Sequence, residues 1–225
     1  MALEVERDGD VLVARWCDGE NRLNPASLDA LESLCERVEN ETGPLALVVT
    51  GDAKFFSNGL DLDRFAAHPE ELGPTAGRLQ VLLGRLLVLP CYTVAAINGH
   101  AFAGGAMLTC GFDHRVMRED RGYWCLNEVE IGLPLSAQMG AAVLGRLPRA
   151  TALEAMLTAR RYGGAEALAA GIADEIAAED RVLPASIERA AAVATKNRTI
   201  VTMHKRLAFA QVAASCGWDL DQHAR

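Results

Sequence analysis

The sequence predicts an α/β fold, because short apolar segments typical of buried strands alternate with longer segments of helical periodicity. Residues 45–51 (LALVVTG) and 93–98 (TVAAIN) are continuous apolar runs that end in, or directly before, a glycine. Residues 28–38 and 79–87 repeat leucine at helical spacing. Apolar strands that alternate with helices favour a parallel sheet covered on both faces, with crossover connections.

Cap and turn signals place the other elements in order. Residues 11–16 alternate as a strand does, and a turn over 19–24 leads to a helix that begins at Asn24-Pro25 and extends to Gly43. The remaining expected elements are a glycine-containing loop over 54–62, a polar stretch ending at Gly73-Pro74, a helix over 76–89, a short helix over 103–110, a strand over 114–117, an extended segment over 123–130, and alanine-rich helices from residue 138 with breaks at Pro148, Gly163-Gly164 and Gly171.

Length and charge limit the class of protein. The 225 residues fit one domain, which we expect to comprise a core over 1–180 and a C-terminal helical extension over 181–225. The 22 Lys and Arg against 30 Asp and Glu give a net charge of −8, which argues against a surface for nucleic acid or anionic membranes. The start, MALEVERDGD, has no apolar signal segment and no apolar run spans a membrane, so a cytoplasmic protein is expected. Six scattered cysteines are expected to be reduced thiols.

Two glycine-containing turns follow predicted strands, at residues 55–62 (FFSNGLDL) and 98–105 (NGHAFAGG). Ligands of α/β sheets bind at the carboxyl ends of strands, where glycine lets free backbone N–H groups approach them. Neither turn has the spacing of a phosphate loop or a dinucleotide site. Taken alone, each is more typical of a structural turn.

A carboxylate within apolar sequence is the third candidate feature. Glu128 is flanked by Leu126, Val129 and Ile131, and burial there would raise its pKa toward that of a general base. The alternative is an outward residue on an edge strand, and Glu130 would share its face in an extended segment. The histidines lack metal-ligand spacing, and no serine or cysteine nucleophile motif is present. No metal is therefore expected.

In combination and in this order, the segments FFSNGLDL, AAINGHAFAGGAMLTCGFDHRVM and GYWCLNEVEIGLPL resemble the enoyl-CoA hydratase/isomerase (crotonase) superfamily. AEALAAGIADEI is similar to the motif that precedes the family's last core strand, so the resemblance covers roughly residues 11–178. It implies a crotonase-like spiral of repeated β-β-α units, a homotrimer or homohexamer, and an acyl-CoA thioester as substrate. No separate cofactor is expected, since coenzyme A is part of the substrate.

The resemblance also implies roles for residues. The backbone N–H groups of Leu60 and Gly104 match the family's oxyanion hole, and Glu128 matches one of the two glutamates of its hydratases. The other glutamate position is Met107, which cannot transfer a proton and is expected to line the acyl pocket. Further substrate-binding positions are implied at Ser57, Asn58, Gly59, Asp61, Leu62 and Asn127, and Arg22 and Lys54 are candidates for the phosphates, although such cations are commonly just solvated.

One glutamate suffices to move a proton between two carbons, so the sequence favours a Δ3-Δ2-enoyl-CoA isomerase, an enzyme of fatty acid β-oxidation. The alternatives are an enoyl-CoA hydratase, another enolate chemistry of the family such as decarboxylation or thioester hydrolysis, and a non-catalytic acyl-CoA-binding homologue. The preferred acyl length is left open by the sequence.

Overall fold

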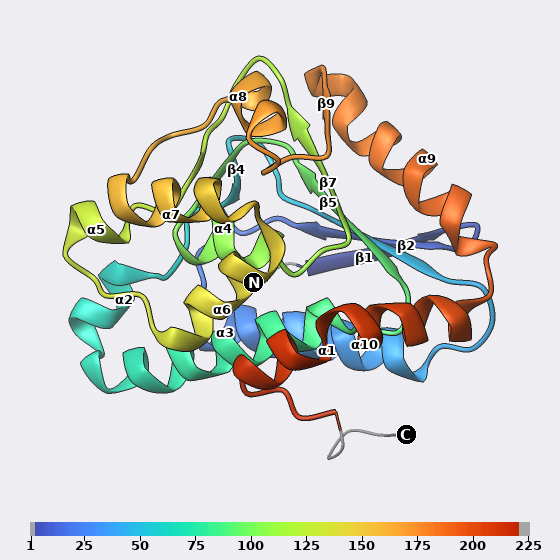
Figure 1. The fold of residues 1–225 in the computed structure, drawn as a ribbon, viewed down its shortest axis with the longest axis horizontal. Coiled ribbons are helices and arrows are strands. Elements are labelled where there is room, and N and C mark those ends of the chain that lie inside the picture. The colour runs from blue at the N-terminus through green and yellow to red at the C-terminus, as the bar shows by residue number, and fades with distance from the viewer. Residues whose placement is uncertain (1–2, 221–225) are drawn as a thin grey trace.

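The computed structural model describes residues 3–220 and confirms the α/β fold. A six-stranded sheet has the order β1-β2-β3-β5-β7-β9, with β1 and β2 antiparallel and the other neighbours parallel (Figure 1). Its strands are β1 (Leu3–Asp8), β2 (Val11–Trp16), β3 (Ala46–Thr50), β5 (Tyr92–Ile97), β7 (His114–Arg118) and β9 (Glu175–Ala177). The expected strands over 11–16, 45–51, 93–98 and 114–117 are thereby confirmed.

A second, three-stranded parallel sheet lies beside the first, in the order β4 (Phe55–Ser57), β6 (His100–Phe102) and β8 (Trp124–Cys125). The chain passes from β3 to β4, from β5 to β6 and from β7 to β8, so each turn of the spiral adds one strand to each sheet before a helix follows. Parallel strands share an orientation, and the carboxyl ends of β4, β6 and β8 therefore meet at one edge.

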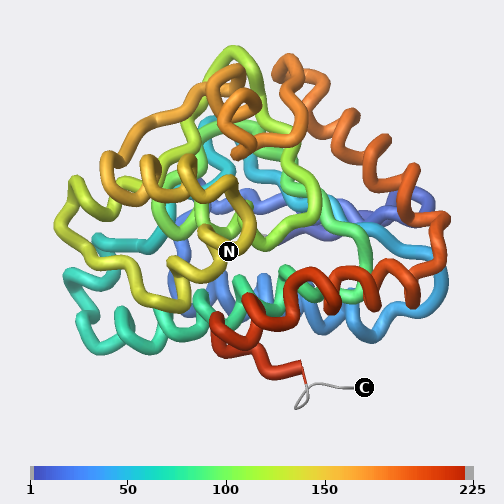
Figure 2. The backbone as a smooth tube through the Cα atoms, in the orientation of Figure 1, coloured from blue at the N-terminus to red at the C-terminus, as the bar shows by residue number. Residues whose placement is uncertain are grey.

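Helices cover both faces of the large sheet. In the described chain they are α1 (Pro25–Asn40), α2 (Leu62–Ala67), α3 (Leu72–Leu87), α4 (Gly104–Thr109), α5 (Glu128–Ile131), α6 (Ala137–Arg146), α7 (Arg149–Thr158), α8 (Gly164–Ala169), α9 (Val182–Ala194) and α10 (Arg198–Ser215). Two 3-10 turns span Pro69–Glu71 and Glu179–Arg181. Helix α9 packs on one face of the sheet (Figure 2). The side chains of the other face join the larger core with α1, α3 and α4. Burial on both faces explains the continuous apolar runs.

Three expectations about local structure are corrected. Strands β1, β4 and β6 were not expected, and the last two lie within the segments assigned to turns. Helix α3 begins at Leu72, ahead of the expected residue 76, because Pro74 sits in its first turn, where no N–H is needed. The segment over 123–130 is extended only at Trp124 and Cys125 and then becomes α5.

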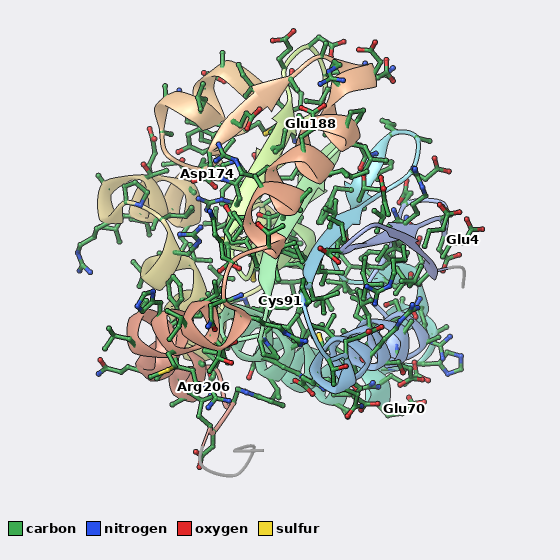
Figure 3. All side chains as sticks on the ribbon, turned by 90° about the vertical axis from the view of Figure 1, so that its right-hand side faces the viewer. Glu4, Glu70, Cys91, Asp174, Glu188 and Arg206 are labelled. Atoms are coloured by element: carbon green, nitrogen blue, oxygen red, sulfur yellow. The ribbon has the colours of Figure 1, made fainter. Side chains whose placement is uncertain are left out.

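Helix α10 lies on α3 and α6 and is tied to the end of the large sheet by a buried ion pair. The Lys205 ammonium donates to the Asp113 carboxylate at 2.6 Å and to the carbonyl oxygen of Cys91 at 2.9 Å. Figure 3 marks the position of Cys91, just before β5. Asp113 also accepts from the backbone N–H and the hydroxyl of Thr93. All six cysteines are free. In the described residues, none of the helices has the length and apolarity needed to span a bilayer.

We expect Lys205→Ala to lower the free energy of unfolding by about 3 kcal/mol, because it leaves a buried carboxylate without its cation. Lys196→Ala is the control, since Lys196 is exposed and makes no ion pair in the described chain; its effect should stay within about 0.5 kcal/mol. Urea denaturation of both variants measures the difference. Equal effects would show that the ion pair does not anchor α10.

Candidate active site

The carboxyl-terminal edge of the small sheet brings the three sequence motifs together. Leu60 follows β4, Gly104 follows β6 and Glu128 follows β8, each within three residues of its strand. Gly59 shows how close the first two turns are: a Cβ atom built on it would lie 3.2 Å from the Gly104 nitrogen and 2.8 Å from the Ala103 Cβ. With a φ of +75°, Gly59 also adopts a conformation that favours glycine.

Two backbone N–H groups are free at this edge. The two neighbours of Leu60 pair with Leu23: the Gly59 carbonyl accepts from the Leu23 N–H, and the Asp61 N–H donates to the Leu23 carbonyl. Because alternate residues of an extended segment bond on the same side, the Leu60 N–H points away from Leu23. Gly104 is the first residue of α4, so its N–H has no intrahelical acceptor. Neither N–H group donates to any acceptor among residues 3–220.

Backbone strain aims the second of these groups. Ala103 has φ +48° and ψ −124°, a conformation rare for residues other than glycine, and its ψ sets the direction of the Gly104 N–H. Helix α4 sits directly on β4, since a Cβ atom on Gly105 would lie 2.5 Å from the Ser57 carbonyl oxygen. The two donors are thus held by a strained turn and by close backbone packing.

Glu128 begins α5 and is buried, with 8% of its surface exposed. Its Oε2 atom has no hydrogen-bond partner in the described chain. Burial raises the pKa of this carboxyl group from 4.5 to about 7, against a smaller lowering by a backbone hydrogen bond. Glu130 is exposed and pairs with Arg161, because a helical turn separates two residues that an extended segment would place on one face.

The strand before Glu128 is anchored from two sides. The Trp124 indole N–H donates to the Thr109 hydroxyl of α4 at 2.9 Å. The backbone of Trp124 also pairs with Tyr162, whose hydroxyl donates to Glu154. These contacts fix β8, which ends three residues before Glu128, relative to α4.

The residues expected to bind substrate along the first turn have mostly internal partners. The Ser57 hydroxyl is fully buried and donates to the Asn21 carbonyl at 2.7 Å, and the Asn58 side chain donates to Glu20. Asp61 caps α2 and accepts from Arg64. Leu62 is exposed, with 41% of its surface accessible.

Met107 and Asn127 flank the second donor and the glutamate in the sequence. Met107 lies in α4, one turn after Gly104, and is 1% exposed. Asn127 precedes α5, and its buried Oδ1 atom has no partner in the described residues. This unpaired amide oxygen and the unpaired carboxyl oxygen of Glu128 belong to consecutive residues, and a bound molecule can satisfy such buried polar atoms.

The two candidate phosphate ligands are placed differently. The Arg22 guanidinium contacts the carboxylates of Glu20, Asp61 and Asp63, so its charge is already more than balanced. Lys54 precedes β4, at the opposite end of that strand from Leu60, and lies 5.2 Å from the centre of the Phe55 ring. No cluster of His, Cys, Asp and Glu suited to a metal ion occurs in residues 3–220.

Sequence reasoning missed Asn21, which is fully buried at a φ of +52°. Its side chain donates to the carbonyl oxygens of Phe55 and Phe56 in β4. Asparagine tolerates left-handed backbone, and its position in the turn over 19–24 was the available signal. The partners, more than 30 residues away, were not predictable from it.

Two sheets wound into one spiral, with a buried glutamate and two free N–H groups at one edge of the small sheet, define the class as a crotonase-fold protein. The comparison with family models agrees: residues 17–218 match the enoyl-CoA hydratase/isomerase family. The chain belongs to this family.

The relatives include proteins named as enoyl-CoA isomerases and proteins named as enoyl-CoA hydratases. The chain is 34% identical over 201 residues to enoyl-CoA delta isomerase 3 of Arabidopsis thaliana, covering 85% of this chain and 84% of that protein. It is also 34% identical over 218 residues to a putative enoyl-CoA hydratase of Thermus thermophilus, covering 92% and 83%. A solved structure described as an Mtb enoyl-CoA isomerase superposes with a TM-score of 0.88 at 30% identity, covering 95% and 93%.

We expect Gly59→Ala to lower the free energy of unfolding by at least about 2 kcal/mol, because the new methyl group combines left-handed strain with backbone clashes. Gly140→Ala in α6 is the matched control, as a Cβ atom there meets nothing within 4 Å. It should be neutral or stabilising by up to about 1 kcal/mol. Thermal and urea unfolding measure both effects. Equal stabilities of the two variants would contradict the close approach of the two turns.

Glu128→Gln is expected to stabilise the protein at high pH. The folded state binds the Glu128 proton more tightly than the unfolded state, so the stability of the natural protein falls as pH rises from about 4.5 to about 7. Gln removes that penalty, giving a gain on the order of 3 kcal/mol at pH 8 and little at pH 4. Urea denaturation at the two pH values measures it, and a gain independent of pH would contradict a raised pKa.

Proposed function

We propose that the protein is a Δ3-Δ2-enoyl-CoA isomerase. Glu128 removes a proton from C2 of a 3-enoyl thioester, the N–H groups of Leu60 and Gly104 hold the oxygen of the resulting dienolate, and Glu128 returns the proton to C4. The double bond moves from C3–C4 to C2–C3, and no atom or electron is gained or lost. Two preorganised donors at a developing oxyanion lower such a barrier by several kcal/mol in known enzymes.

The observation that carries this proposal is the single buried glutamate of the described chain, Glu128. The family's hydratases use a second glutamate, and this chain has methionine at the matching position. A pKa of about 7 suits Glu128 to act first as base and then as acid near neutral pH. By the family resemblance, Met107 matches the position of the hydratases' other glutamate, and a thioether cannot activate water. Instead it would form part of a dry wall beside the intermediate.

The relatives support the same assignment. The similarity to plant isomerases and to a mycobacterial isomerase covers most of the chain. The chain is expected to act as a homotrimer or homohexamer. Apolar residues on the exposed side of α10, Ile200, Met203 and Leu207, offer surface for such contacts.

The hydratase is the second candidate, and the similarity to a putative hydratase of Thermus thermophilus favours it. It requires a group other than Met107 to handle the second proton of water addition. Purified protein given crotonyl-CoA and 3-hexenoyl-CoA side by side distinguishes the two. The isomerase proposal expects 3-hexenoyl-CoA to be converted at least tenfold faster.

We expect Glu128→Gln to lower kcat for 3-hexenoyl-CoA by roughly 10²- to 10⁴-fold, because it removes the only proposed proton carrier. In the natural protein kcat/KM should rise with pH and level off above about pH 7, since the free enzyme needs the ionised carboxylate. Glu130→Gln is the matched control, being an exposed glutamate two residues away, and should keep its activity within about twofold. Full activity of Glu128→Gln would contradict the proposal, and so would a natural protein that leaves 3-hexenoyl-CoA unconverted.

A further inference from the structure

The open edge of the small sheet is closed by a segment that is not a regular strand. Strand β4 is the outer member of that sheet, so its outer edge has no strand partner. Residues 20–23, which we call the strut, pair with that edge. The Asn58 N–H donates to the Glu20 carbonyl, and Leu23 forms one hydrogen bond with Gly59 and one with Asp61, on either side of Leu60. The strut lies between β2 and α1 and so occupies the small-sheet position of the first β-β-α unit.

Asn21 is the centre of the strut, and its side chain is fully used. Its Nδ2 atom donates to the carbonyls of Phe55 at 3.2 Å and Phe56 at 3.1 Å, and its Oδ1 atom accepts from the Asp18 N–H at 2.9 Å. The ladder between β4 and β6 is irregular at this point, between Phe55 and Ser57. The amide of Asn21 therefore satisfies the carbonyls that a neighbouring strand would bind.

A second connection runs from Asn21 to the donor turn itself. The Asn21 carbonyl accepts from the Ser57 hydroxyl at 2.7 Å, and the same Ser57 oxygen accepts from the Gly59 N–H at 3.3 Å. Beyond Gly59, the two hydrogen bonds of Leu23 flank Leu60. Every N–H from Asn58 to Asp61 except that of Leu60 is thus engaged with, or connected to, the strut.

We propose that Asn21 is a positioning residue that aims the Leu60 N–H at the thioester oxygen. The inference rests on the proposed function only in taking that N–H as the donor. Without the Asn21 amide, two buried carbonyls of β4 lose a donor and the turn after β4 loses its brace. The Leu60 N–H would then sample directions away from Gly104, and charge on the thioester oxygen would be less stabilised.

Asn21→Gly tests the role of the amide, because glycine keeps the left-handed backbone and removes only the side chain. We expect kcat to fall roughly 10- to 100-fold with KM changed less than about threefold, and the apparent pKa of the kcat/KM profile to stay the same. Asn98→Ala is the matched control: that amide also donates to the Phe55 carbonyl, but it binds Gly51 and Ala53 before β4 rather than the turn after it. It should keep kcat within about twofold.

The direct readout is the infrared carbonyl stretch of bound hexanoyl-CoA labelled with ¹³C at C1, a saturated thioester that cannot isomerise. The natural protein and Asn98→Ala should lower this frequency relative to free ligand, and Asn21→Gly should lose most of that shift. Ser57→Ala, which cuts the connection to Gly59 alone, should lose part of it and serves if Asn21→Gly does not fold.

The outcomes separate the two proposals. A full carbonyl shift and a natural kcat in folded Asn21→Gly would overturn the positioning role. A carbonyl shift that is present in the natural protein and lost in Asn21→Gly, without isomerisation by either, would leave that role standing and remove the isomerase proposal. A natural protein that isomerises while showing no carbonyl shift would overturn the positioning role alone.

Discussion

Parallel pairing of the three short strands β4, β6 and β8 determines where everything functional lies. Each strand has only two or three residues, yet their shared direction places three consecutive turns at one edge. The larger sheet supplies the rigidity that such short strands lack, because each strand of the small sheet directly follows a buried strand of the large one: β3, β5 or β7. A site assembled from backbone needs this support, since the direction of an N–H group is set by the backbone around it.

Close backbone approach is the second constraint, and it accounts for the small residues of the site. Gly59 faces Phe102 and Ala103, and Gly105 faces Ser57, at separations that leave no room for a Cβ atom. Glu128 then lies where burial makes its charge costly, which is compatible with stability because its proton can stay bound near neutral pH. Packing and electrostatics thus serve the same few residues.

The parts predictable from sequence are those whose signal spans several residues. The strands over 45–51 and 93–98 and the helix at Pro25 were predicted because burial on both faces and a capping asparagine leave local patterns. Strands of two or three residues fall below any periodicity, so β4, β6 and β8 were read as turns or as one longer segment. Periodicity alone could not separate Glu128 from Glu130, because it does not show that a helix begins there; only the family resemblance singled out Glu128. Asn21 was invisible because its partners are set by the spiral, not by neighbours in sequence.

The carboxylates around Arg22 bear on how a ligand arrives. A small pocket beside the first turn is lined by the carboxylates of Asp18, Glu20 and Asp61 and by the Arg22 guanidinium. Asp63 also pairs with Arg22. With a net charge of −8 on the chain, the acyl-CoA thioester proposed as substrate, itself an anion, would meet a protein of its own sign. Added salt screens that repulsion, so ionic strength would speed the encounter of ligand and protein, the reverse of electrostatic steering.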